Sequence, residues 1–406
     1  MAAEQGRWIP ARVAQLDELL RRHDYRGWDP FDLPNAPIFR PLPAGWWLPQ
    51  LILSKAGSRV VPDRVRRALR VPAIEDPKIY ACAYFGYRYS GDTDAAREMA
   101  DRLATLATRD PDGGAYWGYD YTWATRTGGV NPRGASTIVP GAFALFALLD
   151  DLVVSGDERN RDLIVAALDH YRTRHRSAGE AGEFLGYFAG ATANTHNANL
   201  LGCAALTLGG RALGREDWLA DAASAAATSV HAVDASGYLP YADHSSGDWT
   251  DCFHHLYVIA CATVLERLNP HVDRPGFRDA TARLRGYLRE HFVRDDGLVN
   301  YYPGALYPID PHNYAAAAIF AVVFGEQGDL PPSAGEPLLR RVDDLMWDSQ
   351  KGRYSYRRHR RRRDSRLFVR WTQAWMFAAL SIVDHEMTRS RNTSESTRNF
   401  VAQFGN

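Results

Sequence analysis

The sequence predicts an all-α fold, a closed (α/α)6 toroid or six-hairpin barrel with short β-hairpin-like segments at one mouth of the ring. Three observations lead to this fold class. One module recurs along the chain, strongly apolar helices alternate with amphipathic ones, and an amphipathic segment near the N-terminus supplies the helix that completes the count.

Each copy of the module begins with a glycine and aromatic segment, which a polar cluster follows. The segments GGAYWGYDY, EFLGYFAG, GYLPYAD, GLVNYYPG and GRYSYRR start at Gly113, Glu183, Gly237, Gly297 and Gly352. The starts lie 54 to 70 residues apart, so each copy is long enough for one helical hairpin and its connections.

A strongly apolar helix and then an amphipathic helix follow each segment. The predicted apolar helices are Asp76–Tyr89, Val139–Leu152, Asn197–Leu208, Cys252–Leu268, Tyr314–Phe324 and Trp371–Val383. The predicted amphipathic helices are Asp92–Thr108, Arg159–Arg174, Arg215–His231, Arg274–His291 and Pro337–Trp347. An inner helix is apolar on all sides because neighbours surround it, whereas an outer helix shows one face to water.

Closure of the ring depends on the segment Pro10–Arg22. It places Val13, Leu16, Leu19 and Leu20 on one face and so serves as the missing outer helix. If this segment did not close the ring, the same modules would form an open helical solenoid, which is the structural alternative.

The modules define one domain over residues 1–387. Residues 24–71 are rich in proline and aromatic residues, and we expect a long ordered loop over one mouth of the ring. Residues 388–406 are polar and contain many Ser, Thr, Asn and Arg, so we expect a disordered tail.

Composition excludes several classes of protein. The 406 residues are 46% apolar and 24% charged, which is typical of a globular chain, and the net charge of zero gives no argument for nucleic acid or an anionic membrane. The four cysteines lack metal-ligand spacing, so we expect no metal site, no cofactor and a reducing compartment. With no secretory signal and no apolar run of membrane-spanning length, the expected location is the cytoplasm.

Polar residues that a core does not explain lie between each hairpin-like segment and its inner helix. They stand at the N-terminal ends of the inner helices, so the ring brings them to one mouth. Helix N-termini carry unpaired N–H groups and the positive end of the helix dipole, which suits hydroxylated or anionic ligands. The sequence therefore predicts one wet cleft at this mouth.

The fourth module, DWTDCFHH, is the densest polar set. If Asp248 caps the helix, then Asp251, His254 and His255 share one face, where a carboxylate orients an imidazole base. We take Asp251 and His254 as catalytic, and His255 and Trp249 as substrate-binding. The structural alternative is an N-cap beside a histidine held in a helix interface.

The fifth module reads YYPGALYPIDPHN. Asp310 before Pro311 forms an N-cap and first-turn proline pair, which is enough to explain Asp310 structurally. The same segment still predicts a site: its catalytic candidates are Asp310, His312 and Tyr302, and its substrate-binding candidates are Tyr301, Tyr307 and Asn313.

The remaining modules contribute binding candidates. The third gives His196 and Asn197, the sixth gives Arg370, Trp371 and Gln373, the second gives Trp117, Tyr119 and Tyr121, and the lead-in gives Trp28 and Asp29. Arg370 either binds a substrate carboxylate or phosphate, or it forms an ion pair with Asp251 or Asp310. Aromatic rings among hydrogen-bonding groups are typical of a sugar site, because the C–H face of a sugar stacks on a ring while its hydroxyls need donors and acceptors.

These motifs carry a resemblance to a known group of proteins. GWDPFDLPN, NTHNANLLG, DWTDCFHH, LYPIDPHN and VRWTQAWM resemble motifs of the α/α toroid proteins of cell-surface polysaccharide and glycan gene clusters. The chain is also distantly similar to the C-terminal helical domain of D-glucuronyl C5-epimerases. The likeness spans about residues 24–384 and implies the toroid fold and a sugar substrate without fixing the reaction. Two features depart from the pattern, the basic run 357–366 and Leu33-Pro34 in place of a glycine-containing turn.

The leading functional hypothesis is an enzyme that processes an acidic, uronate-containing glycan, free or lipid-linked, by general acid/base chemistry as an epimerase or lyase. His254 or one of the tyrosines would take the proton beside the carboxylate, which Arg370 would neutralise. Three alternatives stay open: a glycoside hydrolase that uses Asp251 and Asp310, an isoprenoid-processing toroid, and a non-catalytic glycan-binding scaffold. The basic run is either a solvated loop or a steering surface for an anionic glycan or a lipid pyrophosphate. The oligomeric state stays open.

Overall fold

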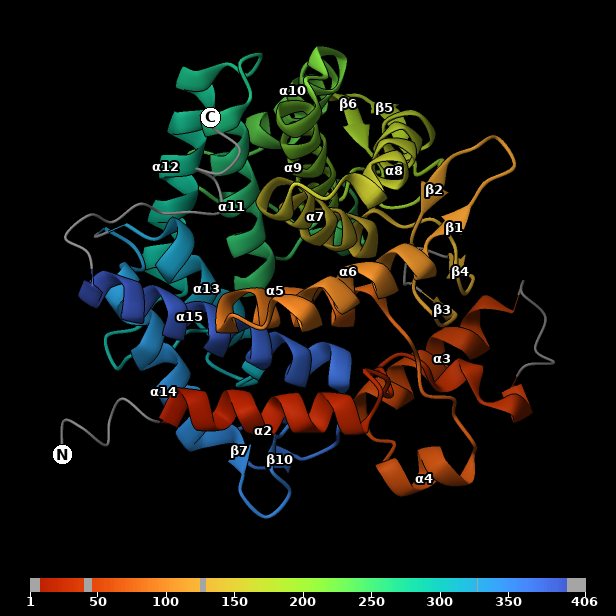
Figure 1. Cartoon of the computed structure of the whole chain (residues 1–406), viewed down its shortest axis with the longest axis vertical. Coiled ribbons are helices and arrows are strands. Elements are labelled where there is room, and N and C mark those ends of the chain that lie inside the picture. The colour runs from red at the N-terminus through yellow and green to blue at the C-terminus, as the bar shows by residue number, and fades with distance from the viewer. Residues whose placement is uncertain (1–7, 40–45, 125–128, 327, 393–406) are drawn as a thin grey trace.

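The computed structural model describes residues 8–39, 46–124, 129–326 and 328–392. Over these residues the chain forms a ring of inner helices surrounded by outer helices (Figure 1). The inner helices are α5 (Pro77–Ser90), α7 (Ile138–Ser155), α9 (His196–Leu213), α11 (Cys252–Leu268), α13 (Pro311–Phe324) and α15 (Ala374–Asn392). The outer helices are α2 (Trp8–Arg22), α6 (Thr93–Leu106), α8 (Arg161–Arg174), α10 (Glu216–His231), α12 (Arg274–His291) and α14 (Gly335–Met346).

The ring is closed. Consecutive inner helices contact one another, and the last of them, α15, packs against the first, α5. The N-terminal helix α2 lies beside α15, as Figure 1 shows. It is tied to α14, since Arg12 Nε donates to Asp343 Oδ1 at 2.8 Å and Trp8 Nε1 donates to Glu336 Oε1 at 2.9 Å. The predicted toroid is confirmed, and the open solenoid is excluded.

Local capping explains where the inner helices begin and end. The Asp310 carboxylate accepts the His312 backbone N–H at 3.0 Å, as the sequence predicts for an N-cap. On α11 the cap is Asp251, which accepts the His254 N–H at 3.0 Å, and not Asp248. At the other end, α7 stops at Gly156, whose φ of 67° a residue with a side chain rarely adopts.

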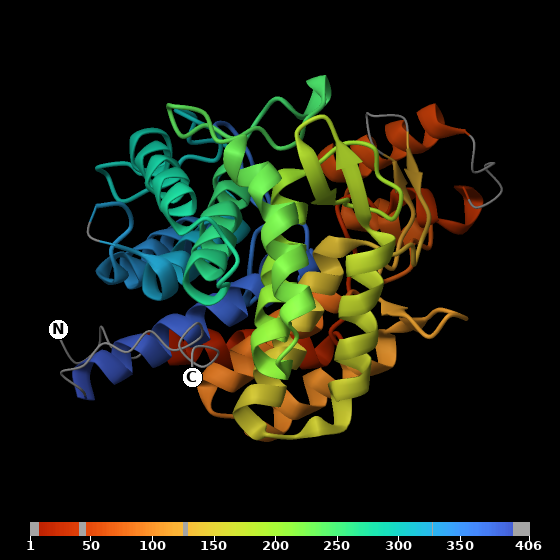
Figure 2. The ribbon, with the colours of Figure 1, turned by 90° about the horizontal axis from the view of Figure 1, so that it is seen from above.

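Short antiparallel hairpins form at the segments that start at Gly113, Glu183 and Gly352, whereas those at Gly237 and Gly297 contain only isolated β-bridges. The hairpins pair β1 (Thr108–Arg109) with β2 (Ala115–Tyr116), β3 (Trp123–Ala124) with β4 (Val130–Asn131), β5 (Arg176–Gly179) with β6 (Gly182–Leu185), β7 (Trp347–Asp348) with β8 (Arg353–Tyr354), and β9 (Arg357–Arg358) with β10 (Arg363–Asp364). In the longest pair, Ser177 lies opposite Phe184. Figure 2 shows the β5–β6 hairpin on the opposite side of the ring from the turn that joins α7 to α8.

The segment 24–71 differs from the predicted loop because it contains helices. It forms the short helices η1 (Leu33–Asn35) and η2 (Pro37–Phe39), followed by α3 (Trp47–Arg59) and α4 (Asp63–Ala68). Arg66 holds the segment together: it is fully buried, forms an ion pair with Asp32, and donates to the Gly57 carbonyl at 2.9 Å. Pro49 stands inside α3 and Pro62 stands between α3 and α4, so the segment offers no long uninterrupted helical period in the sequence.

The C-terminal boundary also differs from the prediction. Helix α15 begins after a π-helical turn, Val369–Gln373, and continues to Asn392, so residues 388–392 are helical and not part of a disordered tail. The rest of the predicted tail, residues 393–406, lies outside the described residues.

Helix α7 is long and apolar enough to cross a membrane by length and composition. Within the described residues it is the one helix with this property, and 67% of it is buried in the ring. An inner helix that neighbours surround on all sides meets the same criterion, and α7 is such a helix.

Candidate functional site

The N-terminal ends of the inner helices open into one cleft of about 1040 Å³. The predicted site residues that line it are Tyr119, Tyr121, Asn197, Trp249, Asp251, His254, Tyr301, Tyr302, His312, Arg370 and Trp371. One wall comes from α3 through Lys55 and Arg59, and the adjoining wall comes from the basic run through Arg357 and Arg362. The two walls touch, since Arg362 donates to the Arg59 carbonyl oxygen at 3.1 Å. The basic run therefore faces the cleft on at least part of its length.

His254 lies beside Asp251 at the start of α11. The Asp251 carboxylate is buried, while the His254 side chain keeps 20% of its surface exposed to the cleft. His254 Nδ1 is 2.9 Å from Asp251 Oδ1, although the angle falls short of a hydrogen bond. Tyr241 and Trp249 form a stacked pair beside this ring, with centroids 4.5 Å apart. An imidazole next to a carboxylate, with one edge in the cleft, can serve as a general base.

His312 provides a second imidazole from the first turn of α13. Its Nε2 lies 2.8 Å from the hydroxyl of Tyr257, and its buried Nδ1 has no hydrogen-bond partner. Burial, and then the nearby charge of Lys78, hold the pKa of His312 well below 6.5, so the ring is neutral. His254 and His312 both pack on Phe253, with ring centroids 4.0 and 4.5 Å from it. The two histidines therefore flank one aromatic ring of the cleft wall.

Asp310 forms hydrogen bonds with other side chains of the protein and does not line the cleft. It is fully buried, and its Oδ2 accepts from Arg357 Nε at 2.7 Å and from Trp371 Nε1 at 2.9 Å. Arg357 also donates to the Tyr301 hydroxyl at 2.8 Å. This network fixes the side chains of Tyr301 and Trp371 at the cleft wall. Asp310 is therefore a positioning residue for these two side chains.

Arg370 lines the cleft, but its guanidinium forms an ion pair with Asp29. Its Nε donates to Asp29 Oδ2 at 2.7 Å, and its second carboxylate neighbour is Asp76 at 3.8 Å. Of the two ion-pair partners weighed from the sequence, Asp251 and Asp310, neither is the one observed. Asp29 lies far away in sequence, in the segment before the first inner helix, and only the closed ring brings it to α15.

The other predicted residues outside the cleft have structural partners. Trp28 donates to the Val71 carbonyl oxygen, Trp117 to that of Leu103, Asn313 to that of Asn300 and Gln373 to that of Tyr354. His196 is buried against Ser229 and Asp243, and His255 against Leu284. Tyr307 differs from these residues, since it is 38% exposed and is not among the residues that line the cleft. The helical period explains the pair on α11. His254 faces the cleft, and its neighbour His255 turns toward the outer helix α12.

Sequence reasoning missed several residues that line the cleft. They are Lys78, Tyr187, Tyr241, Phe253 and Tyr257. Tyr257 follows His254 by three positions on the same helix, a spacing that places both on one face. Lys78 stands in the first turn of α5, the place that His312 occupies on α13, so the module itself indicated it.

The described residues contain no group of three or more His, Cys, Asp or Glu side chains that could hold a metal ion. Cys252, the residue on which an isoprenoid-processing zinc site would depend, is buried outside the cleft, and burial raises the pKa of its thiol.

His255 gives a pH-dependent prediction for stability. Its ring is buried with Nε2 2.9 Å from the Leu284 carbonyl oxygen, and burial lowers its pKa from 6.5 to about 4. Between these values the unfolded chain binds a proton that the folded chain does not. The free energy of unfolding should therefore fall by about 3 kcal/mol as the pH drops through this window, and then level off.

Urea titration of the wild type and of His255→Asn, at about pH 7 and about pH 4, measures this loss. The variant should be less sensitive to pH by that amount, since it lacks the buried imidazole. An equal pH dependence in the two proteins would contradict the prediction.

Comparisons with known proteins bear on the fold. No family model and no curated protein matches the chain. Among solved structures, cellobiose 2-epimerase from Bacillus thermoamylovorans has a TM-score of 0.57 at 16% identity, and the match covers 78% of this chain and 90% of that one. UGL with dGlcA-Glc-Rha-Glc has a TM-score of 0.55 at 14% identity, covering 94% and 95%. An unsaturated glucuronyl hydrolase specific for heparin has a TM-score of 0.53 at 12% identity, covering 79% and 87%. At these identities the likeness establishes the α/α toroid.

Proposed function

We propose that the chain is a carbohydrate-active enzyme that processes an acidic, uronate-containing glycan by general acid/base chemistry, of the epimerase or lyase type. One observation carries the proposal: His254 beside Asp251 and His312 beside Tyr257 face the same aromatic cleft around Phe253. The proposal keeps the expected cytoplasmic location and a role in making or modifying polysaccharide.

The chemistry requires a proton to leave the carbon beside the sugar carboxylate. In the proposed reaction His254 takes this proton, and the Asp251 carboxylate stabilises the imidazolium that forms. The electron pair moves into the carboxylate as an enediolate. Delivery of a proton from the His312 and Tyr257 pair to the opposite face of that carbon gives the epimer. Delivery of the proton from the same pair to the neighbouring glycosidic oxygen lets this oxygen leave as a hydroxyl group, and an unsaturated uronate results. Tyr302, at the cleft rim and 43% exposed, contributes to substrate binding.

The aromatic lining supports a sugar. Tyr119, Trp123, Tyr187, Tyr241 and Trp249 are placed around the cleft, and flat rings with a few polar neighbours suit the C–H faces of pyranoses. The solved structures with this fold include epimerases and unsaturated glucuronyl hydrolases, which supports the same substrate class.

The geometry favours proton abstraction over hydrolysis by the two aspartates. A hydrolase would need Asp251 and Asp310 on either side of the glycosidic bond, but Asp310 is fully buried and bonded to Arg357 and Trp371. The pair that faces the cleft is instead an imidazole pair.

Incubation with glucuronate-containing oligosaccharides in D₂O tests the proposal. If the reaction is an epimerisation, we expect an isomer of the substrate with deuterium at the carbon beside the carboxylate, seen by NMR. If it is an elimination, we expect a chain divided without uptake of water, in which that carbon has lost its hydrogen to a double bond. Products that each gain the elements of water would indicate hydrolysis. Binding without any change in the oligosaccharide would indicate a scaffold, and either result would contradict the proposed reaction.

A further inference from the structure

Lys78 is a buried cation at the floor of the cleft. It lies in the first turn of α5, where its backbone N–H bonds to the Asp76 carboxylate at 2.9 Å, and its side chain lines the cleft with 4% of the residue exposed. The reaction proposed above does not use it.

The ammonium group of Lys78 has no carboxylate within 4.0 Å among the described residues. Its neighbours are the faces of Phe143, at 4.4 Å from the ring centroid, and of Trp375, at 5.4 Å. The other buried cations of the cleft differ in this respect, since Arg370 is bonded to Asp29 and Arg357 to Asp310. A buried charge without a partner is costly, whereas aromatic faces compensate it only in part.

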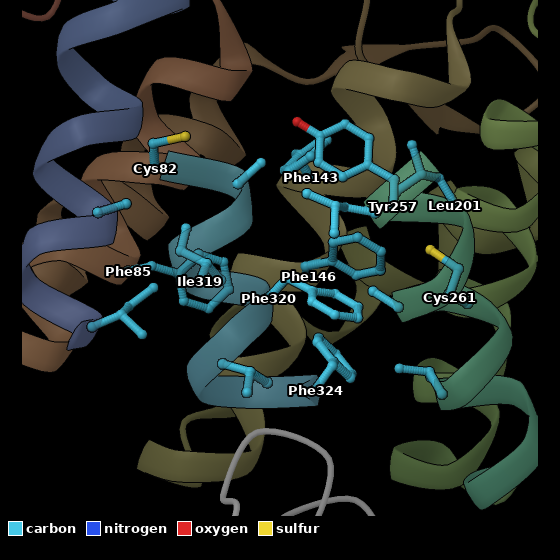
Figure 3. A pocket seen from close by; sticks show the side chains of 18 of the residues that line it. Cys82, Phe85, Phe143, Phe146, Leu201, Tyr257, Cys261, Ile319, Phe320 and Phe324 are labelled. Carbon is cyan, nitrogen blue, oxygen red and sulfur yellow. The ribbon is translucent and has the colours of Figure 1, made fainter. Parts of the chain in front are cut away.

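The side of the floor that faces away from the cleft cannot supply a partner. A second cavity of about 180 Å³ lies there along the axis of the ring, and its lining is apolar (Figure 3). Phe143, Trp375 and Tyr257 belong to this lining, and the Tyr257 hydroxyl is bonded to His312. Within the described part of the chain, no charged side chain lines this cavity. The medium below Lys78 is therefore of low dielectric, which strengthens the attraction for any anion that arrives from the cleft.

We infer that the Lys78 ammonium is the anchor for the carboxylate of the substrate, an inference that rests on the proposed function. Arg370, the cation expected for this role from the sequence, is neutralised by Asp29 and instead braces the segment before α5.

The position of Lys78 fits the proposed chemistry. Lys78 and His312 share Trp375, whose ring centroid is 4.6 Å from that of His312. A carboxylate held by Lys78 therefore places the neighbouring C–H bond beside the two histidines. Burial lowers the pKa of Lys78 to about 8, as expected for an ammonium that the protein leaves without a carboxylate in contact.

Two matched disaccharides test the inference by isothermal titration calorimetry. One is glucuronate joined to glucose, and the other is cellobiose, which carries a hydroxymethyl group in place of the carboxylate. We expect the wild type to prefer the uronate, and Lys78→Met to lose roughly 10- to 100-fold in affinity for the uronate while its affinity for cellobiose stays unchanged. Lys78→Arg should retain part of the preference, and Lys351→Met, which removes an exposed lysine, should behave as the wild type.

Stability separates this role from a structural one. Lys78→Met keeps the volume and removes a buried charge that contacts no carboxylate and that interacts with Asp76 and Asp29 only at longer range, so its melting temperature should change little. If Lys78→Met fails to fold, the ammonium has a structural role and the inference is overturned. Lys78→Gln is a second variant without the charge, and it shows in a folded protein whether any preference for the uronate survives.

The binding outcomes distinguish the two proposals. A preference for the uronate that survives in Lys78→Met or Lys78→Gln overturns the anchor and leaves the proposed function standing. Equal binding of both disaccharides by the wild type also overturns the anchor alone. If the wild type binds neither sugar, the proposed function fails together with the inference.

Discussion

Replacement of His254 by alanine is expected to lower kcat on a uronate-containing glycan by about 100- to 10,000-fold. The reason is that His254 is the histidine of the cleft with both an exposed edge and a carboxylate beside it, Asp251 at 2.9 Å. Loss of the base should act on the proton transfer step and leave substrate affinity little changed, so KM should move far less than kcat.

Steady-state kinetics and deuterium exchange in D₂O measure this effect. His271→Ala is a matched control, since His271 also sits beside a carboxylate, Glu216 at 2.8 Å, but on the exposed surface. The control should keep wild-type kcat. Activity of His254→Ala within tenfold of the wild type would remove His254 from the mechanism, and a change confined to KM would make it a binding residue.

Replacement of Arg370 by methionine is expected to lower the free energy of unfolding by about 3–5 kcal/mol. Arg370 and Asp29 are both buried, and removal of the guanidinium leaves the Asp29 carboxylate in a medium that cannot solvate it. The pair also joins α15 to the segment before α5, so its loss should loosen the wall that this segment gives to the cleft.

Urea unfolding of Arg370→Met measures the loss, with Arg278→Met as the matched control. Arg278 pairs with Glu266 at 3.1 Å on the surface with 75% of its side chain exposed, and such a pair contributes about 0–1 kcal/mol. The double variant Asp29→Leu/Arg370→Met should recover part of the stability, because both buried charges are then absent. A loss for Arg370→Met no larger than for Arg278→Met would contradict this account of the ion pair.

Most of the fold could be predicted from the sequence, because each helix of a toroid shows a periodic pattern of apolar residues within its own segment. The predicted helices Cys252–Leu268 and Arg274–His291 match α11 and α12 at both ends. The segment Pro10–Arg22 is helical and closes the ring, as expected from its apolar face. Most of the remaining boundaries lie within a few residues of the predicted ones, where capping carboxylates and terminal glycines stand, but α15 continues to Asn392, well beyond the predicted end at Val383.

The helices of the segment 24–71 could not be predicted in the same way. Its helices α3 and α4 show no long apolar period, and they are held by buried contacts such as those of Arg66 with Asp32 and with the Gly57 carbonyl oxygen. Such a contact joins positions far apart and leaves no periodic pattern along the chain. The same reason hid the partner of Arg370, because Asp29 reaches it only after the ring has closed.

The sequence predicted where the site lies, but it did not predict the contacts of each residue in it. The module placed Asp251, His254 and His312 at one mouth, and all three line the cleft. The sequence did not reveal which polar residues would form hydrogen bonds within the protein instead of facing the cleft. Asp310 is one of them, since it is bonded to Arg357 and Trp371. Such pairing is decided by tertiary contacts, which spacing alone does not encode.

The most direct test of the account is a crystal structure of the protein soaked with the disaccharide of glucuronate and glucose. We expect the sugar in the cleft, its carboxylate on the Lys78 ammonium, and the carbon beside that carboxylate about 3–3.5 Å from the His254 imidazole. A sugar bound outside the cleft, or one whose carboxylate lies away from Lys78 and whose reacting carbon is out of reach of both His254 and His312, would contradict it.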